Sequence, residues 1–404
     1  MVMAGRIATF GAKIAVVRAA FVASAGTGLL LAASAAATDA ALAPRWSASQ
    51  VGALRLWANA APSDALPVPD MRKLETAIAA GDAAAIDREA RSLALRLARL
   101  HLHGSAGSAA RKGWRISDAA DSAGLDARLD GALTAGRLSE FFEELRPSHP
   151  EYAALRQAYQ NESDPARRAL LVANMERWRW MPQNPGRSFL LVNAAAFEAT
   201  LWREGERSGQ WRVIVGKPKT STPTFAATVT GVTLNPWWDV PASIVRESVG
   251  ALVRRNPALA RQRGYVWSGG RIRQKPGPGN ALGRMKLVMP NPYSVYLHDT
   301  PNRALFEEEV RTFSHGCVRV GNALGLAETL LAGVKTRGEI DAVLAAGQTT
   351  TVPLAAPVPV YVAYFTASVA PDGTLTVHGD PYGRDKAITG TVTPAGFCAA
   401  DAPL

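Results

Sequence analysis

The segment Ser314–Arg319, which reads SHGCVR, places a cysteine among residues that could make it a nucleophile. His315 lies two positions before Cys317, and a second histidine, His298, lies nineteen positions before it. A free thiol, with a pKa of about 8.5, is only slightly ionised at neutral pH. An imidazole that takes the proton holds the sulfur as a thiolate. We therefore expect Cys317 to be a nucleophile, kept as a thiolate–imidazolium ion pair by one of these histidines.

The residues next to the cysteine suit acyl transfer. Gly316 has no side chain, so a substrate carbonyl can approach the backbone N–H groups, which could form an oxyanion hole. Arg319 can bind a carboxylate through the parallel hydrogen bonds of its guanidinium. A short helix is expected over residues 321–333, and the dipole at its N-terminus favours negative charge near the cysteine.

Two other interpretations apply to the same residues. A buried cysteine is usually a small apolar side chain, and lone histidines are more often structural. A Cys/His/His zinc site is the sharper alternative. His315 and Cys317, however, lie only two positions apart around one glycine, and no second cysteine pair supports a zinc site. We therefore favour catalysis, and we expect neither a metal nor a cofactor.

The first 37 residues resemble an export signal rather than part of a fold. They hold three basic residues and no acidic one, and an apolar run from Ala19 to Ala33 precedes small-residue sites of the A-x-A kind. This pattern predicts a secretory signal peptide cleaved near Ala37, with an uncleaved membrane anchor as the alternative. Exported chains usually oxidise their cysteines in pairs. Because a disulfide between Cys317 and Cys398 would consume the nucleophile, we expect Cys398 to be free.

The composition is that of a globular protein. The chain has 404 residues, of which 48% are hydrophobic and 20% charged, which allows two or three domains and excludes a disordered chain. The formal net charge of +11 suits an anionic polymer or a membrane surface, although it would also serve solubility alone.

The residue pattern divides the chain into a helical first half and a β-rich second half. Apolar residues recur at helical spacing between residues 47 and 181, and the period changes to two after Gly186. We expect an α+β protein with a helical N-terminal scaffold, a mostly β, sandwich-like catalytic domain and a short lid insert. The expected boundaries are 1–37 for the signal peptide, 38–183 for the helical scaffold domain, 184–347 for the catalytic domain with its lid insert at 241–282, and 348–404 for C-terminal strands and tail.

Several single elements can also be placed. One helix carries Ile86, Leu93 and Leu100 on one face and ends before Gly104. Further helices are expected near His149, from Pro165, and over residues 338–346. The expected strands are 188–193, 197–202, 211–215, 225–234, 285–289 and 294–298, followed by a hairpin of 358–369 and 374–378.

The SHGCVR segment, with a histidine about nineteen residues upstream in YLHDTP, resembles the L,D-transpeptidase catalytic domain of the YkuD type. Further motifs resemble the large subgroup with a helical scaffold and a lid: WRWMP at 178–182, GKP at 216–218, NPWW at 235–238, PGPGNALG at 276–283 and YGRD at 382–385. The resemblance covers roughly residues 135–390. This subgroup is expected to carry a peptidoglycan-binding module before WRWMP, but here Tyr159 runs almost directly into Ser163, so we expect that module to be missing.

The resemblance implies a role for each matching position. It implies catalytic roles for Cys317 as nucleophile, His298 as base and His315, and substrate or oxyanion contacts for Ser314, Gly316, Arg319, Tyr296 and Trp238.

The resemblance also implies an activity. Cys317 would attack the carbonyl of meso-diaminopimelate in a donor tetrapeptide stem, and an amine of a second stem would attack the thioester to give a 3–3 cross-link. The acceptor stays open among another stem, a free D-amino acid, a protein amine and water, which would make the protein an L,D-carboxypeptidase. A non-catalytic wall-binding scaffold is the remaining alternative. The implied partners are peptidoglycan stem peptides and not nucleic acid. Carbapenem-type β-lactams are the expected covalent inhibitors, and the expected location is the periplasm.

Overall fold

The computed structural model describes residues 45–116, 124–370 and 372–392. The expected signal peptide and Cys398 lie outside these residues. All the described elements belong to one compact unit, Pro44–Leu404. Within the described ranges, no helix is both long enough and apolar enough to cross a membrane.

The first part of the described chain is helical, as expected. The α3 helix begins after Asp82, whose side chain accepts a hydrogen bond from Ala85 N–H, and ends at Gly104. It buries Leu93 and Leu97 in a core shared with its neighbours. The helices are α1 (Ala48–Ala60), α2 (Arg72–Ala80), α3 (Ala83–His103), α4 (Leu125–Thr134), α5 (Leu138–Glu144), α6 (Pro150–Asn161) and α7 (Pro165–Arg179), with a 3₁₀ turn at Ala61–Asp64.

The α6 and α7 helices belong to a second core, which joins the helices to strands. His149 caps α6 and Asp164 caps α7, and each helix starts with a proline, whose missing N–H costs nothing at that position. Trp178 on α7 stacks between His149, at 4.3 Å between ring centroids, and Phe365, at 4.6 Å. This core continues onto the β2, β3 and β13 strands described next, so scaffold helices and sheet share buried side chains.

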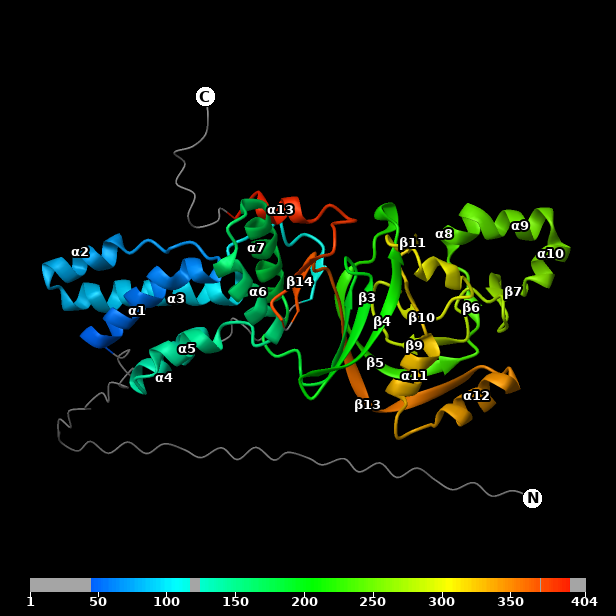
Figure 1. The fold of residues 1–404 in the computed structure, drawn as a ribbon. Helices are drawn as coiled ribbons and strands as arrows, with labels where there is room; N and C mark the ends of the chain where they lie inside the picture. The colour runs from blue at the N-terminus through cyan, green and yellow to red at the C-terminus, as the bar shows by residue number, and fades with distance from the viewer. Residues whose placement is uncertain (1–44, 117–123, 371, 393–404) are drawn as a thin grey trace, which may run out of the picture. The chain divides into compact units, whose positions relative to one another are not determined.

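The second half forms one large sheet that closes on itself (Figure 1). The strand order is β1-β5-β13-β2-β3-β4-β12-β10-β9, and β5 also pairs with β9, which completes the closure. The sandwich-like domain that we expected is thus a closed sheet. Its strands are β1 (Trp114–Arg115), β2 (Phe189–Asn193), β3 (Glu198–Arg203), β4 (Glu206–Gly216), β5 (Thr224–Leu234), β9 (Met285–Val288), β10 (Leu297–His298), β12 (Val318–Val320) and β13 (Thr350–Ala363), with β11 (Thr312–Ser314) beside β4.

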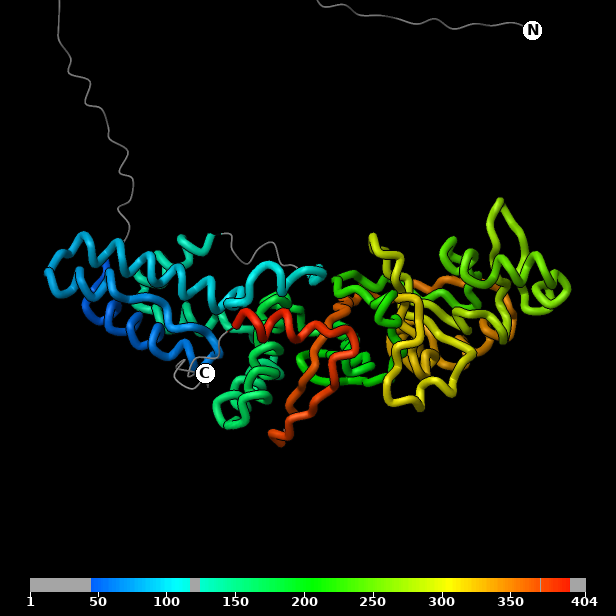
Figure 2. The backbone as a smooth tube through the Cα atoms, turned by 90° about the horizontal axis from the view of Figure 1, so that it is seen from above, coloured from blue at the N-terminus to red at the C-terminus, as the bar shows by residue number. Residues whose placement is uncertain are grey.

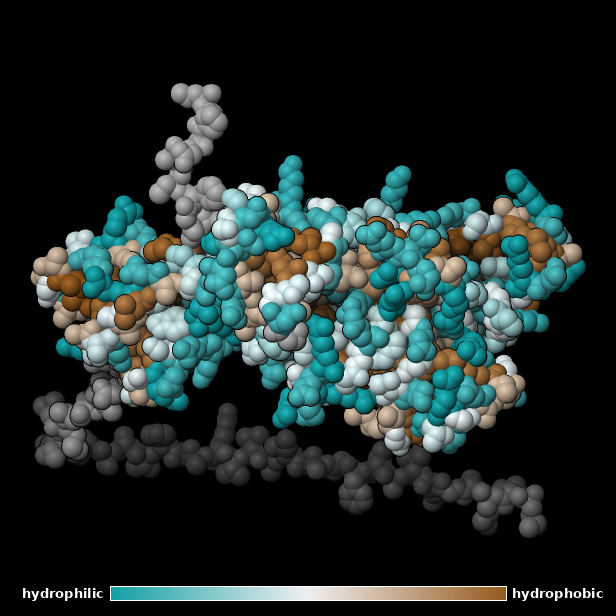
Figure 3. Space-filling view, in the orientation of Figure 1, coloured by the Kyte–Doolittle hydropathy of each residue, from teal (hydrophilic) through white to brown (hydrophobic). Residues whose placement is uncertain are grey.

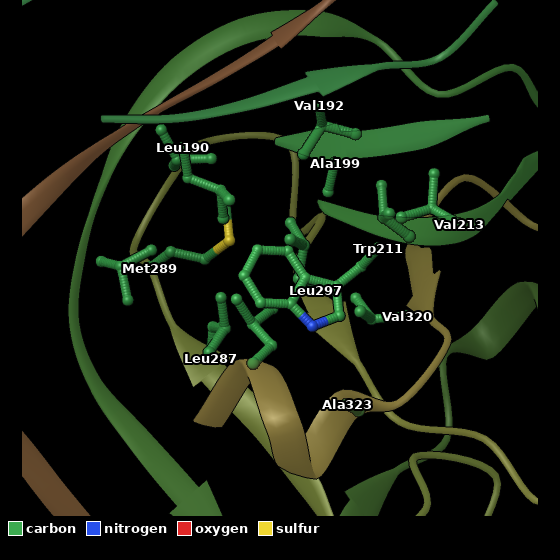
Figure 4. Close-up of a cluster of buried hydrophobic side chains, with 14 of the residues drawn as sticks. Leu190, Val192, Ala199, Trp211, Val213, Leu287, Met289, Leu297, Val320 and Ala323 are labelled. Atoms are coloured by element: carbon green, nitrogen blue, oxygen red, sulfur yellow. The ribbon is translucent and has the colours of Figure 1, made fainter. Parts of the chain in front are cut away.

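The inward residues of these strands fill the closed sheet. Figure 4 shows Trp211 from β4 among side chains of β2, β3, β9 and β10. The α11 helix (Ala323–Leu330) adds Ala323, Leu326 and Leu330 to the same core. The α12 helix (Arg337–Ala346) follows, with a capping box at Thr336. This packing confirms the alternating pattern of the predicted strands and the two helices expected after the cysteine.

Five short strands were not predicted, β6 (Trp238–Asp239), β7 (Tyr265–Ser268), β8 (Arg271–Gln274), β11 and β12, and two further departures concern β13 and β1. We expected a hairpin at 358–369 and 374–378, but β13 begins at Thr350 and pairs with both β5 and β2, while only β14 (Ala367–Val369) and β15 (Leu375–Val377) form a hairpin. The prolines of β13 argue against a central strand. The register shift between Pro353 and Val358 accommodates them. The second departure is β1, which lies in the helical half of the sequence yet pairs with β5 in parallel.

The insert at 241–282 folds as a lid with a small core of its own. Val240, Val249, Ile272 and Leu282 form this core with Trp238. The helix of residues 257–262 contacts a three-stranded sheet within the insert. The backbone of the insert lies at one end of the described chain (Figure 2), and apolar side chains reach the surface over residues 250–262 (Figure 3). The elements are β6 (Trp238–Asp239), α8 (Ala242–Ile244), a π-helix (Val245–Val249), α9 (Gly250–Arg255), α10 (Pro257–Gln262), β7 (Tyr265–Ser268) and β8 (Arg271–Gln274).

A buried polar network connects α7 to the C-terminal helix α13 (Asp385–Thr389). Arg177, which is 1% exposed, forms an ion pair with Asp385 at 2.6 Å and donates to Thr366 Oγ1 at 3.0 Å. Asn174 Oδ1 accepts a hydrogen bond from Thr366 N–H at 2.8 Å. Because a buried guanidinium without a carboxylate is costly, these contacts fix the scaffold helix against the C-terminal segment.

We predict that Asp385→Asn lowers the free energy of unfolding by about 3 kcal/mol, because it leaves the Arg177 guanidinium buried without its counter-charge. The measurement is urea denaturation followed by circular dichroism. Asp341→Asn is the matched control, since Asp341 pairs with Arg337 at an exposed site and its loss should cost no more than about 0.5 kcal/mol. Equal effects of the two variants would contradict the prediction.

Candidate active site

Two neighbouring strands carry the predicted nucleophile region and the predicted base. β10 and β12 run in parallel, with Leu297 paired to Val318 and His298 paired to Arg319. Leu297 and Val318 are fully buried in the core of the closed sheet. Because successive side chains of a strand point to opposite faces, His298 and Arg319 lie on the other face. The fold thus brings the histidine back from nineteen residues upstream to the strand beside the cysteine.

On that face, the predicted site residues line one cavity of about 330 Å³. Seven of the eight residues singled out from the sequence belong to its wall: Cys317, His298, His315, Ser314, Arg319, Tyr296 and Trp238. Gly316 is the exception. The lid contributes Pro241, Ser243 and Ile244 to the wall, and the PGPGNALG motif contributes Ala281 and Leu282.

Burial disfavours the charged form of the nucleophile. The Cys317 thiol lies near Ser294 O, with Sγ at 3.8 Å, and desolvation raises the pKa of this thiol above its ordinary value. A backbone hydrogen bond from Tyr296 and the charges of Arg319 and Lys286 oppose this rise, but desolvation is the largest effect. At neutral pH the free protein therefore holds Cys317 as a thiol.

Burial also disfavours the charged form of the base. His298 is 4% exposed, and desolvation lowers the pKa of its imidazole to about 3. Its Nδ1 lies 2.5 Å from the carbonyl oxygen of Asp299, so Nδ1–H is the donor and Nε2 keeps its lone pair. The Asp299 side chain is held by an ion pair with Arg303 at 2.6 Å and by the backbone N–H of Arg284 at 2.8 Å. The imidazole is thus fixed in the tautomer of a base.

These two pKa directions correct one expectation. We expected a preformed thiolate–imidazolium pair, but a raised thiol pKa and a lowered imidazole pKa both favour the neutral forms. The physical reason is desolvation, which is the largest effect on each group: His298 is buried and Cys317 is half-buried. Proton transfer from Cys317 to the base therefore belongs to the attack step rather than to the resting state.

The second histidine has a different partner. His315 Nε2 lies 2.8 Å from Glu247 Oε2, and Glu247 belongs to the π-helix of the lid. The His315 and Glu247 side chains are 33% and 54% exposed, so this pair lies at the rim of the cavity. Sequence reasoning missed Glu247.

The loop that carries the cysteine has a conformation that requires glycine. Gly316 has φ of 117°, which a side chain would strain. Ser314 Oγ accepts from Gly316 N–H at 3.0 Å and donates to Cys317 O at 2.6 Å. This corrects the expected oxyanion role of Gly316, because its N–H already has a partner. Cys317 N–H has no hydrogen bond to the residues described and stays available.

The side-chain hydroxyls of Thr222 and Tyr382 anchor this loop to the GKP turn. Thr222 Oγ1 donates to Gly316 O at 2.9 Å and accepts from Gly216 N–H at 2.9 Å. Tyr382 OH donates to Gly216 O at 2.8 Å and lies 3.2 Å from Thr222 N–H. A Cβ on Gly216 would lie 2.1 Å from Thr220 O, so no other residue fits there. The GKP and YGRD motifs, recognised without a role, thus position the cysteine loop.

The remaining wall residues define what the cavity can bind. In the described ranges, the guanidinium of Arg319 makes no hydrogen bond or ion pair with another side chain, which leaves it for a ligand. Tyr296 lies between His298, at 5.9 Å between rings, and Lys286 Nζ, at 5.2 Å from its ring. Trp238 is buried and belongs to the small hydrophobic core of the lid insert. No group of three or more potential metal ligands occurs in the part of the chain that the structure describes.

Comparison with known families gives the geometry its context. Residues 187–353 match the model of the YkuD family, described as the L,D-transpeptidase catalytic domain, and residues 38–158 match the model described as a Scaffold domain. Residues 187–353 thus resemble an L,D-transpeptidase catalytic domain. The Scaffold match covers the helical first half, as the sequence predicted, and only three residues separate α6 from α7, which leaves no room for a further module between these two helices.

One relative agrees with this assignment over part of its length. A protein of Haemophilus influenzae named "Putative L,D-transpeptidase" is 31% identical over 240 residues, which are 54% of this chain and 48% of that protein. The chain therefore spans about half the length of this relative. Among solved structures, an L,D-transpeptidase from Mycobacterium smegmatis has 13% identity and a TM-score of 0.24, covering 43% of this chain and 58% of the other.

A second solved structure is L,D-transpeptidase 3 from Mycobacterium tuberculosis in complex with a faropenem-derived adduct. It has 15% identity and a TM-score of 0.23, covering 44% of this chain and 60% of the other. At these TM-scores the solved structures add nothing to the assignment, which rests on the two family models.

The neutral forms that desolvation favours at the candidate site predict the pH dependence of Cys317 alkylation. In a Cys398→Ser background, the rate constant with iodoacetamide should rise about tenfold per pH unit through the neutral range and level off only above pH 9, because the thiolate fraction limits it. The measurement is intact mass against time at each pH. A rate that stays flat from pH 5 to pH 8 would instead reveal a preformed ion pair.

We also predict that Tyr382→Phe slows the reaction of Cys317 with an acylating agent about tenfold, because the GKP turn and the cysteine loop lose a shared hydroxyl. Stopped-flow fluorescence of acylation measures this rate. Tyr159→Phe is the control, since the buried Tyr159 hydroxyl has no hydrogen-bond partner among the described residues and its removal should leave the rate unchanged. Unchanged acylation in Tyr382→Phe would show that this hydroxyl does not position the loop.

Proposed function

We propose that this protein is a cysteine-dependent peptidoglycan L,D-transpeptidase that forms 3–3 cross-links between meso-diaminopimelate residues. One observation carries the proposal: a cysteine, a base-form imidazole and an unpaired guanidinium line the same cavity. The family assignment of residues 187–353 supports the reaction class.

The first half-reaction forms a thioester. His298 Nε2 takes the Cys317 proton as the sulfur attacks the diaminopimelate carbonyl of a donor tetrapeptide. Negative charge develops on the carbonyl oxygen, and the free N–H of Cys317 is placed to bind it. When the C–N bond breaks, the proton passes from His298 to the leaving D-alanine amine. Arg319 binds a carboxylate of the donor stem, which keeps the reacting carbonyl near the sulfur.

The second half-reaction transfers the acyl group. An amine of a second stem attacks the thioester carbonyl, the C–S bond breaks, and His298 receives a proton that it returns to Cys317. A free D-amino acid or a protein amine could replace the stem, and water would give an L,D-carboxypeptidase.

We propose an exported, periplasmic location for this activity. The observations that support it are the signal-peptide pattern of residues 1–37 and the position of the proposed substrate outside the cytoplasm. Residues 1–37 hold three basic residues and no acidic one, so without them the formal net charge of +11 falls to +8, which still suits an anionic wall polymer.

The test of the proposed function is incubation of the mature protein with a carbapenem and with purified tetrapeptide muropeptides. We expect one carbapenem adduct by intact mass, absent in Cys317→Ala, and dimeric muropeptides by mass spectrometry. His298→Ala should lower adduct formation at least 100-fold, because the buried thiol loses its proton acceptor.

The other outcomes have separate meanings. Loss of D-alanine without dimers would make the protein a carboxypeptidase. Binding to isolated wall without any adduct on Cys317 would sink the enzymatic proposal and leave a wall-binding scaffold.

A further inference from the structure

The π-helix of the lid brings a carboxylate to the rim of the cavity. Val245–Val249 forms this wide turn, which is closed by Gly250 N–H donating to Val245 O. A Cβ on Gly250 would lie 2.6 Å from Val245 O, so the turn depends on glycine there. Single π turns are rare and are often found at functional sites. Here the turn presents Glu247 to His315, two residues from the nucleophile.

The Glu247–His315 pair has free hydrogen-bonding capacity. Within the described residues, His315 is the one hydrogen-bond partner of Glu247, so Oε1 remains open at a side chain that is 54% exposed. With Nε2–H donating to the carboxylate, the lone pair of His315 is on Nδ1. A carboxylate that orients an imidazole in this way also stabilises the imidazolium that forms when the ring accepts a proton.

The charge of Glu247 is opposite to that of the two cations that act on the sulfur. Arg319 and Lys286 are the charged groups that act on Cys317, and both are cations suited to the carboxylates of a donor stem. A carboxylate at the rim suits a cationic group instead. The acyl acceptor is such a group, because a primary amine with a pKa near 10 arrives as an ammonium ion and must lose a proton before it can attack.

We propose that Glu247 and His315 form a subsite that binds the ammonium group of the acyl acceptor and removes one of its protons. This inference rests on the proposed function and deepens it. His298 serves the thiol and the leaving group, whereas His315, positioned by Glu247, serves the incoming amine. The acceptor class is a primary ammonium, which a peptide stem, a D-amino acid and a protein lysine share.

The proton balance assigns one histidine to each proton of the acceptor. The ammonium gives its first proton to His315 Nδ1, and the resulting amine attacks the thioester carbonyl. The C–N bond forms, the C–S bond breaks, and Cys317 leaves as a thiolate. The second proton passes from the new amide nitrogen to His298, which returns it to Cys317, while His315 releases its proton to solvent. The products are an amide, the resting thiol and one proton.

The experiment measures how the acyl-enzyme divides between amine and water. The full-length mature protein is supplied with a tetrapeptide muropeptide and D-methionine, and amide and hydrolysed products are counted by mass spectrometry. Glu247→Gln should lower the amide-to-hydrolysis ratio about tenfold, the loss expected for one charge-assisted contact. Glu247→Asp should recover part of the ratio. Glu307→Gln, a control at an exposed glutamate paired with Arg212, should leave it unchanged.

A second acceptor separates this role from a general loosening of the lid. Hydroxylamine is largely uncharged at neutral pH and needs no ammonium subsite. With hydroxylamine, the ratio of hydroxamic acid to hydrolysed product should be the same in Glu247→Gln as in the wild type. The inference would be overturned if the ratio in Glu247→Gln fell equally for both acceptors or fell for neither. The proposed function would still stand in that case, provided that the wild type transfers the acyl group. Absence of any acyl group on Cys317 would overturn both.

Discussion

The conformation of Gly316 is the constraint on which the site depends. Its φ of 117° excludes other residues, and hydrogen bonds fix the loop from two sides: Ser314 within the loop and Thr222 from the GKP turn. Tyr382 joins Thr222 and Gly216 and so carries the restraint to the C-terminal segment. The position of the sulfur relative to the base on β10 follows from these contacts, because β12 begins one residue after the cysteine.

Burial decides how the chemistry can run. Desolvation favours the neutral forms of both Cys317 and His298, so in the proposed reaction charge separation occurs as the substrate is attacked. The cations Arg319 and Lys286 then lower its cost. A thiolate would react with any electrophile that reached it, whereas a half-buried thiol in a cavity favours molecules that fit there. The thiol is therefore less reactive in the free protein, and its reaction is more selective for molecules that bind in the cavity.

The sequence predicted the parts of this site that are encoded locally. Residue type and spacing identified Cys317 and His298, and the expected strand 294–298 includes β10, which carries His298; the strand that follows the cysteine, β12, was not predicted. Contacts between distant segments were not predictable: Glu247 lies 68 residues from His315, and Tyr382 lies 160 residues from Thr222. The motif YGRD was recognised, but only the fold shows that its tyrosine holds the cysteine loop.

Strand assignment failed for similar reasons. The prolines of β13 hid a long strand, because the register shift that accommodates them depends on its partner β5. The ionisation state was also beyond sequence, since desolvation is a property of the folded surroundings. The two-residue strand β1 left no periodic signal at all, yet it has consequences for the whole chain: Trp114 and Arg115 pair with β5, so a segment from the helical half completes the edge of the catalytic sheet. The match to the family model, residues 187–353, therefore leaves out a strand of the sheet. A fragment that begins at residue 187 would expose an unsatisfied strand edge prone to self-association.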